Sequence, residues 1–172
     1  MAVLCQAVVD ADYAFVIHTT NPLTMDDNEE YVELVCGLGE SLVGNAPGQA
    51  LGFTMRKDRL EAGEPIIRSY PSKQVALRGG EFIFRSDSNA EDLEGFAGAG
   101  LHDSIPIVKN AEVEVDYSTE PLMTDDAFRS ELCRKIAQIG KAVEDTMDGS
   151  AQDVEGCVKD GVYYIVQARP QV

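Results

Sequence analysis

The order of apolar and polar residues predicts short β-strands over most of the first 85 residues. Apolar, β-prone runs occupy residues 3–9 and 13–19, with the polar turn 10–12 between them, so we expect the two runs to pair as a β-hairpin. Further strands are expected at residues 31–36, 50–55, 65–70, 73–78 and 81–85. The last of these alternates polar and apolar side chains, as a half-buried strand does.

From Thr124 onward the hydrophobic period becomes that of a helix. Thr124 is expected to cap this helix, Asp125 and Asp126 suit the positive end of its dipole, and Gly149 is expected to end it. Its apolar residues recur every three or four positions: Phe128, Leu132, Ile136, Ile139, Val143 and Met147. We interpret this face as core and not as a cofactor groove, and Gly140 predicts close packing against a strand.

The chain closes on a pattern that predicts a second hairpin. Residues 152–158 and 162–169 are β-rich arms, and Asp160-Gly161 between them is a strong turn signal. The whole pattern therefore predicts an α+β fold, with a mostly antiparallel sheet and one long packing helix in a single continuous unit.

The composition limits what the protein can bind. Among its 172 residues, 30 Asp and Glu face 14 Lys and Arg, and the net charge of −16 argues against nucleic acid or anionic membrane as a partner. A bound phosphate must therefore be held by placed arginines, backbone amides and metal ions. The cysteines form no CxxC pair and are expected to be reduced core residues: Cys5, Cys36, Cys133 and Cys157.

The last hairpin offers candidate chemistry. The period of two in a strand places Asp153 and Glu155 on one side, and the returning strand can bring Gln167 and Arg169 alongside them. A carboxylate and an amide oxygen suit a hard cation, and a guanidinium suits a phosphate. A solvated sheet edge remains the alternative.

Two further segments are weaker candidates. Arg85 ends a predicted strand and leads into a loop of small and acidic residues, 86–100, which suggests either a phosphate cradle or an ordered surface loop. The acids in that loop would oppose an anion unless a metal ion intervenes. The turn Gly37–Glu40 contains a GxG sequence, which is common in proteins. It therefore indicates a nucleotide site only in combination with the other segments.

Several segments together carry a resemblance to a known family. They are MAVLCQ, ADYAFVIHTTNP, GLGESLVGNAPG, RSDSNAEDLEGFAGAGLHDSIP and QDVEGCVKDGVYYIVQARPQV. Essentially the whole chain resembles the C-terminal end of α-glucan, water dikinase, a starch-phosphorylating phosphotransferase. The last hairpin is shared more widely, with pyruvate, phosphate dikinase and phosphoenolpyruvate synthase.

That resemblance implies a partial, ATP-grasp-like nucleotide-binding domain over residues 1–172, in the form of its C-terminal lobe, with ATP and Mg²⁺ as cofactors. The implied ATP contacts are Gln6, Glu40, Arg85, Glu155, Gln167 and Arg169. In this scheme Glu155 and Gln167 are also the metal ligands, and the two arginines contact phosphate. Gln6 would lie beside adenine and Glu40 near the ribose.

The resemblance also implies what this chain leaves to other parts of an enzyme. The phosphorylated histidine belongs to a separate domain, so neither His18 nor His102 is assigned a catalytic role, and the isolated chain is expected to be inactive. The glucan partner would bind through further domains, and the family implies a plastid location. No targeting signal is recognised at the start of the chain, where a strand begins with nothing ahead of it to pair with. The alternatives are a nonenzymatic nucleotide-binding remnant and a fragment of a pyruvate or phosphoenolpyruvate dikinase.

Overall fold

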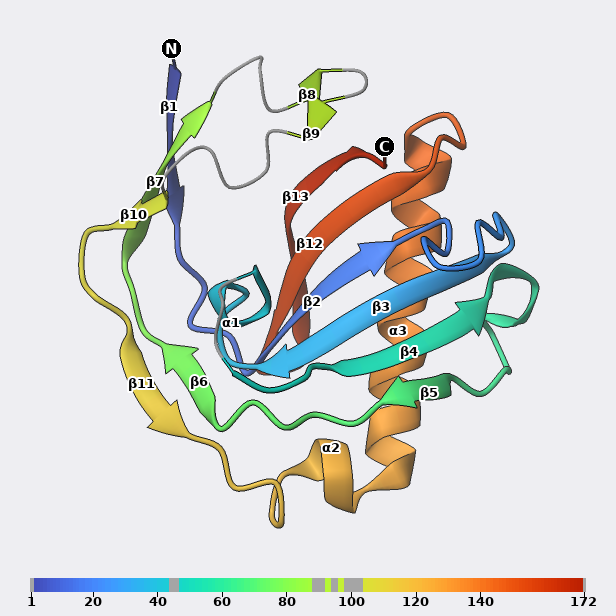
Figure 1. Cartoon of the computed structure of the whole chain (residues 1–172), viewed down its shortest axis with the longest axis horizontal. Coiled ribbons are helices and arrows are strands. Elements are labelled where there is room, and N and C mark those ends of the chain that lie inside the picture. The colour runs from blue at the N-terminus through green and yellow to red at the C-terminus, as the bar shows by residue number, and fades with distance from the viewer. Residues whose placement is uncertain (1, 44–46, 88–91, 94–95, 98–103, 172) are drawn as a thin grey trace.

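The protein has a mixed α+β fold in which antiparallel sheets dominate (Figure 1). Its computed structural model describes residues 2–43, 47–87, 92–93, 96–97 and 104–171. The fold class expected from the alternating and helical patterns is thus confirmed. Within these residues, no helix is both long enough and apolar enough to span a membrane.

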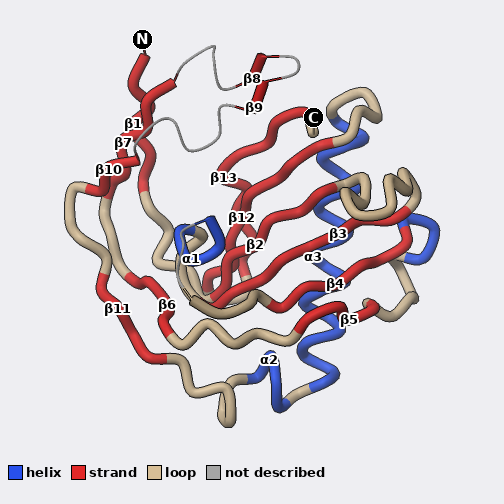
Figure 2. The backbone as a smooth tube through the Cα atoms, in the orientation of Figure 1, coloured by secondary structure: helices blue, strands red, loops and turns tan. Residues whose placement is uncertain are grey.

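A six-stranded sheet forms the centre of the fold, with the strand order β13-β12-β2-β3-β4-β5 and antiparallel neighbours throughout (Figure 2). Its strands are β2 (Tyr13–His18), β3 (Glu29–Cys36), β4 (Leu51–Arg56), β5 (Ile66–Ser69), β12 (Gln152–Lys159) and β13 (Val162–Pro170). The expected hairpin at the end of the chain is therefore present as β12 and β13.

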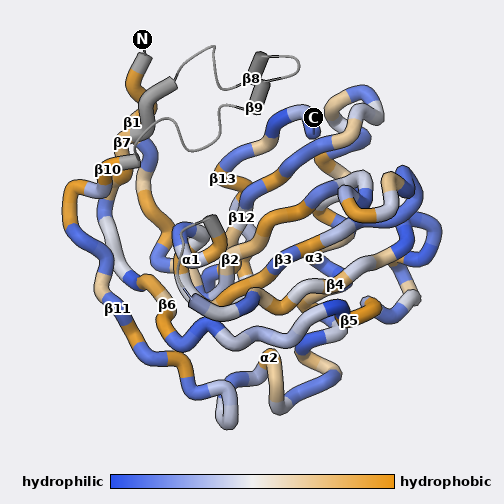
Figure 3. The backbone as a smooth tube through the Cα atoms, viewed as in Figure 1, coloured by the Kyte–Doolittle hydropathy of each residue, from blue (hydrophilic) through white to orange (hydrophobic). Residues whose placement is uncertain are grey.

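Helix α3 (Asp126–Thr146) covers one face of this sheet (Figure 1). Alternate residues of the strands point toward it and are buried with its apolar face: Phe15, Ile17, Val32, Leu34, Phe53 and Val154 from the sheet, and Leu132, Cys133, Ile136 and Ala137 from the helix. Figure 3 shows the hydrophobic stretches of β2 and β3 in the middle of the sheet. Burial of this apolar surface is the main force that holds helix and sheet together.

Gly140 marks the closest approach of the helix to the sheet, as the sequence predicted. A Cβ atom at this position would lie 2.8 Å from Cγ2 of Ile17 and 2.9 Å from Oε1 of Glu30. The side chain of Glu30 is completely buried there, between β3 and α3. A carboxyl group in such a place is unusual, because an ionisable side chain is almost never fully buried unless it is paired.

Three details of the helical region differ from expectation. Thr124 ends a separate short helix, α2 (Pro121–Thr124), and the cap of α3 is Asp125, whose carboxylate accepts a hydrogen bond from the amide of Phe128 at 2.9 Å. Asp125 can do so because its own backbone is extended, with φ −126° and ψ 98°. Met147 is 45% exposed and follows the last helical residue, so it does not belong to the core.

The first strand is also placed differently. β1 (Ala2–Ala7) pairs with β7 (Phe82–Asp87), which pairs in turn with β10 (Ser104–Pro106), so the expected hairpin of residues 3–9 and 13–19 is wrong. The reason is that β2 has both edges occupied, by β3 on one side and by β12 on the other. The polar turn at 10–12 therefore carries the chain from one sheet into another.

Smaller elements cover the second face of the large sheet at one end. They are α1 (Glu40–Val43) and β6 (Val75–Arg78), which pairs with β11 (Ala111–Glu114). Leu42 of α1, Leu77 of β6 and Val8 from the link after β1 pack there on a second core cluster. The remaining elements are the 3-10 turn η1 (Lys57–Arg59) and the strands β8 (Asp92–Leu93) and β9 (Phe96–Ala97).

The cysteines follow the expectation with one exception. Cys36, Cys133 and Cys157 are buried, whereas Cys5 is exposed on β1, and all four are free thiols. The prediction of a core position is therefore wrong for Cys5, because β1 belongs to the three-stranded sheet β1-β7-β10 and not to the central six-stranded sheet.

Gly156 in β12 is predicted to be the most sensitive glycine of the sheet. A Cβ atom there would lie 2.3 Å from the Phe15 ring and 2.8 Å from the carbonyl oxygen of Tyr164, so the ring or the backbone would have to move. We expect Gly156→Ala to lower the free energy of unfolding by about 3 kcal/mol, as overpacking of a core does. Urea denaturation followed by circular dichroism measures this change.

Gly39→Ala is the matched control for that substitution. Its Cβ atom would meet only the Cβ of Ala14 at 3.8 Å, an ordinary contact, so a change below about 0.5 kcal/mol is expected. If both variants lose the same free energy of unfolding, the close approach of Phe15 does not limit the size of the side chain at position 156.

Candidate functional site

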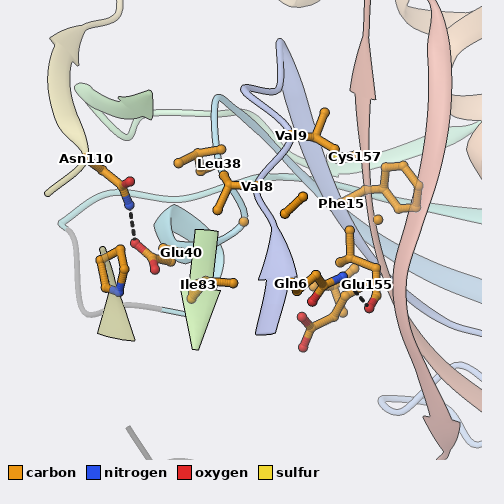
Figure 4. A pocket seen from close by; sticks show the side chains of 16 residues that line it. Gln6, Val8, Val9, Phe15, Leu38, Glu40, Ile83, Asn110, Glu155 and Cys157 are labelled. Atoms are coloured by element: carbon orange, nitrogen blue, oxygen red, sulfur yellow. Dashed lines mark hydrogen bonds between the residues drawn. The ribbon is translucent and has the colours of Figure 1, made fainter. Parts of the chain in front are cut away.

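A pocket of about 200 Å³ opens between the three-stranded sheet β1-β7-β10 and the face of the six-stranded sheet that α3 does not cover (Figure 4). It is lined by Gln6, Ala7, Val8, Val9, Phe15, Val16, Leu38, Gly39, Glu40, Ile83, Pro106, Asn110, Glu155, Gly156, Cys157 and Val166. These residues come from segments at both ends of the chain and from its middle, so the pocket exists only in the folded protein.

The pocket has apolar walls and polar ends. Val8, Leu38, Ile83 and Val166 belong to four different segments and supply much of the wall. Ile83 of β7 lines the pocket, whereas its neighbour Phe82 is 44% exposed. Apolar walls of this kind, with a few polar groups at the ends, are typical of binding sites for small molecules.

The final hairpin brings the expected acid and amide together. In the register of β12 and β13, Glu155 lies opposite Gln167 and Asp153 lies opposite Arg169. Directly opposed residues of an antiparallel pair share one face of the sheet, with their Cβ atoms about 5 Å apart. A bulge after Glu155 inserts Val166 as an extra residue, and Val166 lines the pocket beside this polar group.

Arg169 is held in place by an acid that the sequence did not single out as a site residue. Its Nε and Nη2 atoms donate to Oδ2 of Asp153 at 3.0 and 2.8 Å. Asp153 is also the register partner of His18, whose Nδ1 atom lies 3.8 Å from Oδ1 of Asp153. His18 is partly buried and stacks on Tyr31, with ring centroids 6.4 Å apart.

Two more expected site residues lie at the pocket. Gln6 donates from Nε2 to the carbonyl oxygen of Val166 at 3.3 Å, which ties β1 to β13 across the pocket. Glu40, at the start of α1, accepts a hydrogen bond from Nδ2 of Asn110 at 2.7 Å on Oε2 (Figure 4). Gln6, Glu40 and Glu155 therefore line one pocket, although they lie far apart in the sequence.

Arg85 can be placed only through its backbone. It lies in β7, opposite Leu4 of β1 and Ser104 of β10, so the strand leads from the pocket toward the segment expected to be a phosphate loop. The side chain of Arg85, and residues 88–91, 94–95 and 98–100 of that loop, lie outside the described part of the structure.

The sequence reading missed Asn110 and the anchoring role of Asp153. Asp153 had a usable signal, because it shares the strand face of Glu155 two positions away. Asn110 had none, since it lies 70 residues from its partner Glu40 in a link between two strands. Only the pairing of β11 with β6 brings this link close to α1.

The residues at the hairpin are compatible with a hard cation but do not enclose one. Within the described ranges, no group of three or more His, Cys, Asp or Glu side chains could hold a metal ion. Glu155 and Gln167 offer oxygen donors, which Mg²⁺ prefers, and Mg²⁺ usually takes only one or two protein ligands together with water and phosphate. The donor set thus fits a cation that arrives with its ligand.

Fold and pocket together define an α+β domain with an apolar cleft that ends in acid and amide groups. Comparison with known proteins gives this domain its family. The chain belongs to the pyruvate phosphate dikinase AMP/ATP-binding domain family, whose model matches residues 1–172. It is an ATP-binding domain of the dikinase type.

Individual relatives are similar over the full chain. The chain is 54% identical over 173 residues to the chloroplastic alpha-glucan water dikinase of Solanum tuberosum and 53% identical to alpha-glucan water dikinase 1 of Arabidopsis thaliana. It is 26% identical over 170 residues to a probable phosphoenolpyruvate synthase of Methanocaldococcus jannaschii. Each match covers 99–100% of the chain but only 12% of the relative.

Proposed function

We propose that this chain is the ATP-binding part of a longer enzyme of the α-glucan, water dikinase type. The observation that carries the proposal is the identity of 53–54% over the whole chain to glucan dikinases, against 26% to a phosphoenolpyruvate synthase. Because the chain spans about 12% of the length of these relatives, the complete reaction depends on regions beyond these residues.

The pocket is the basis for a proposed placement of the nucleotide. Adenine would occupy the apolar cleft beside Gln6, and the ribose would lie near Glu40 at its other polar end. The triphosphate would fold back from the Glu40 end toward Glu155 and Gln167, on the side of the pocket where Gln6 lies (Figure 4), and would reach Arg169. Arg85 would contact phosphate from the end of β7. We propose this arrangement as the C-terminal lobe of an ATP-grasp-like domain, which would be completed by a further lobe.

Charge explains why such a site would require magnesium. The residues that line the pocket include Glu40 and Glu155 but no lysine or arginine among those described, and the whole chain carries a net charge of −16. A bare triphosphate would therefore be repelled. Mg²⁺ held by Glu155 and Gln167 would neutralise charge on the phosphate oxygens and orient them.

In the proposed reaction the β-phosphate of ATP passes to a histidine on another domain and from there to a glucosyl unit of an α-glucan. The γ-phosphate passes to water. This chain would bind and orient ATP, while the glucan and the phosphohistidine would belong to other domains. We propose a place in starch metabolism, within a plastid, and the chloroplastic relatives support this proposal.

A chimeric enzyme tests this proposal. The 173-residue segment of the Solanum tuberosum enzyme that matches this chain would be replaced by it. We expect glucan-dependent release of AMP and phosphate from ATP, at a rate within about tenfold of the parent enzyme, because 54% identity preserves the fold and the site.

The same chimera carrying Glu155→Ala is the negative control, and Glu131→Ala on the outer side of α3 is the matched neutral variant. Release of ADP as the main product would contradict the proposal. A folded chimera that binds ATP but releases neither AMP nor phosphate would instead support a nonenzymatic nucleotide-binding remnant.

A further inference from the structure

The polar end of the pocket at Glu40 contains a second side chain that the proposed function leaves without a role. Asn110, in the link between β10 and β11, donates from Nδ2 to Oε2 of Glu40 at 2.7 Å (Figure 4). Both side chains line the pocket. The bond joins two segments 70 residues apart at the point where the ribose of the nucleotide is proposed to lie.

This bond fixes the orientation of both groups. The amide nitrogen of Asn110 must face Glu40, because its oxygen would be repelled by the carboxylate. The amide oxygen Oδ1 is then buried and has no hydrogen-bond partner among the described residues. Without the Glu40 carboxylate, the Asn110 amide would rotate to find a donor for its oxygen, since a buried acceptor without a donor is costly.

The backbone around Asn110 is shaped to admit its side chain. Gly80, after β6, has φ +96°, and a Cβ atom there would lie 3.1 Å from Oδ1 of Asn110 and 3.2 Å from Cγ1 of Val8. Only glycine adopts this backbone conformation readily and leaves that space open. The amide is thus enclosed by Gly80 on one side and tied to Glu40 on the other.

We propose that Asn110 is a positioning residue that holds Glu40 for the hydroxyl groups of the ribose, and so favours ribonucleotides over deoxyribonucleotides. This inference rests on the proposed function. Asn110 occupies Oε2 of Glu40, so a ligand hydroxyl would donate to Oε1. Hydrogen bonds to a charged acceptor are the stronger ones, and their geometry matters most when the acceptor cannot rotate.

The test is the ratio of two dissociation constants for the 172-residue chain, measured by calorimetry with Mg²⁺ and either ATP or a deoxy analogue (2′-dATP and 3′-dATP). For the native chain we expect the weaker-binding analogue to bind at least about tenfold less tightly than ATP. In Asn110→Ala the ratio should fall close to one, with ATP binding weakened by about the same factor.

A merely structural role would weaken ATP and its analogues equally and leave the ratio unchanged. If Asn110→Ala does not fold, Asn110→Asp provides the same test, because it keeps the volume but places an oxygen against Glu40. Glu40→Gln should also reduce the ratio. The inference is overturned if the native chain binds ATP and both analogues equally, or if folded Asn110 variants keep the discrimination. Failure of the native chain to bind ATP at all would instead refute the proposed function.

Discussion

Replacing Glu155 by alanine is expected to weaken the binding of ATP with Mg²⁺ to this chain by about 100-fold, or about 2.7 kcal/mol. Glu155 lines the pocket and lies opposite Gln167, so its carboxylate is the charged member of the proposed cation site. Its loss removes a ligand that the amide of Gln167 cannot replace. Isothermal titration calorimetry of the folded variant measures the change.

The dependence on magnesium makes this prediction specific. Removal of Mg²⁺ with EDTA should weaken ATP binding to the native chain strongly, and should change binding to Glu155→Ala much less. Glu155→Gln, which keeps an oxygen donor but loses the charge, should lie between the two. Glu131→Ala is the control, because Glu131 is exposed on α3 and pairs with Lys135 at 2.8 Å, away from the pocket. Equal affinities for all four chains would remove Glu155 from the site.

Arg169 is a less suitable first target, although it belongs to the same site. Its guanidinium is bonded to Asp153, which is 13% exposed, so Arg169→Ala would leave a nearly buried carboxylate without that partner. Such a change costs stability as well as binding. Glu155 has the advantage that its substitution separates the two effects.

Replacing Glu30 by glutamine is expected to remove a large part of the pH dependence of stability. Burial of Glu30 away from water raises the pKa of its carboxyl group from 4.5 to about 9; Lys57 opposes the rise and Glu144 adds to it. Lys57 and Glu144 form an ion pair of their own at 2.5 Å, and both oxygens of Glu30 are buried without a hydrogen-bond partner in the described structure. Glu30 is therefore protonated in the folded protein at neutral pH.

The sign of the effect follows from the raised pKa. The folded chain holds the proton on Glu30 more tightly than the unfolded chain, so protonation of Glu30 stabilises the folded state. This stabilisation is complete below pH 4.5 and is lost as the pH rises to about 9. One proton changes the free energy of unfolding by at most about 1.4 kcal/mol per pH unit. The total is on the order of 5 kcal/mol, which is large beside the stability of an ordinary domain.

Chemical denaturation at a series of pH values tests this. Relative to the native chain, Glu30→Gln should gain stability steadily between pH 5 and 9, because glutamine carries no charge at any pH. The exposed Glu131→Gln on α3 should show no such gain. Parallel stability curves for the native chain and Glu30→Gln would show that the carboxyl group does not titrate in this range.

Local patterns were sufficient to predict elements whose partners are close in the chain. The turn at Asp160-Gly161 has φ angles of +50° and +75°, which an Asp-Gly pair adopts readily, and it sets the register that opposes Glu155 to Gln167. The apolar stripe of α3 likewise predicted which helix face is buried. In both cases the information lies within a few residues.

Elements whose partners are distant could not be predicted in the same way. β1 pairs with a strand about 80 residues later, and no feature of residues 3–9 excludes the nearer partner. Glu30 had a signal that was not used, because it stands in strict alternation with Val32 and Leu34 on the core side of β3. The choice of Asp125 over Thr124 as cap depends on α2, a single turn that ends at Thr124.

Gln6 and Glu40 were assigned from family resemblance alone, whereas the candidates in the final hairpin also followed from the strand period, and the roles of all of them stay predictions. The structure brings Gln6, Glu40 and Glu155 to one pocket, with Gln167 opposite Glu155. The central claim is that this arrangement binds a nucleotide together with a divalent cation. Affinities alone do not locate the ligand, so a positional measurement is needed.

Paramagnetic broadening in two-dimensional NMR spectra provides that position. ATP with Mn²⁺ in place of Mg²⁺ would be titrated into the labelled chain, since Mn²⁺ accepts the same oxygen ligands. We predict that the amide signals of Gly156, Val166 and Gln167 broaden first, and that those of the acidic turn 26–28 remain sharp. Broadening centred on that turn, or spread evenly over the acidic surface, would contradict a nucleotide and metal site at the final hairpin.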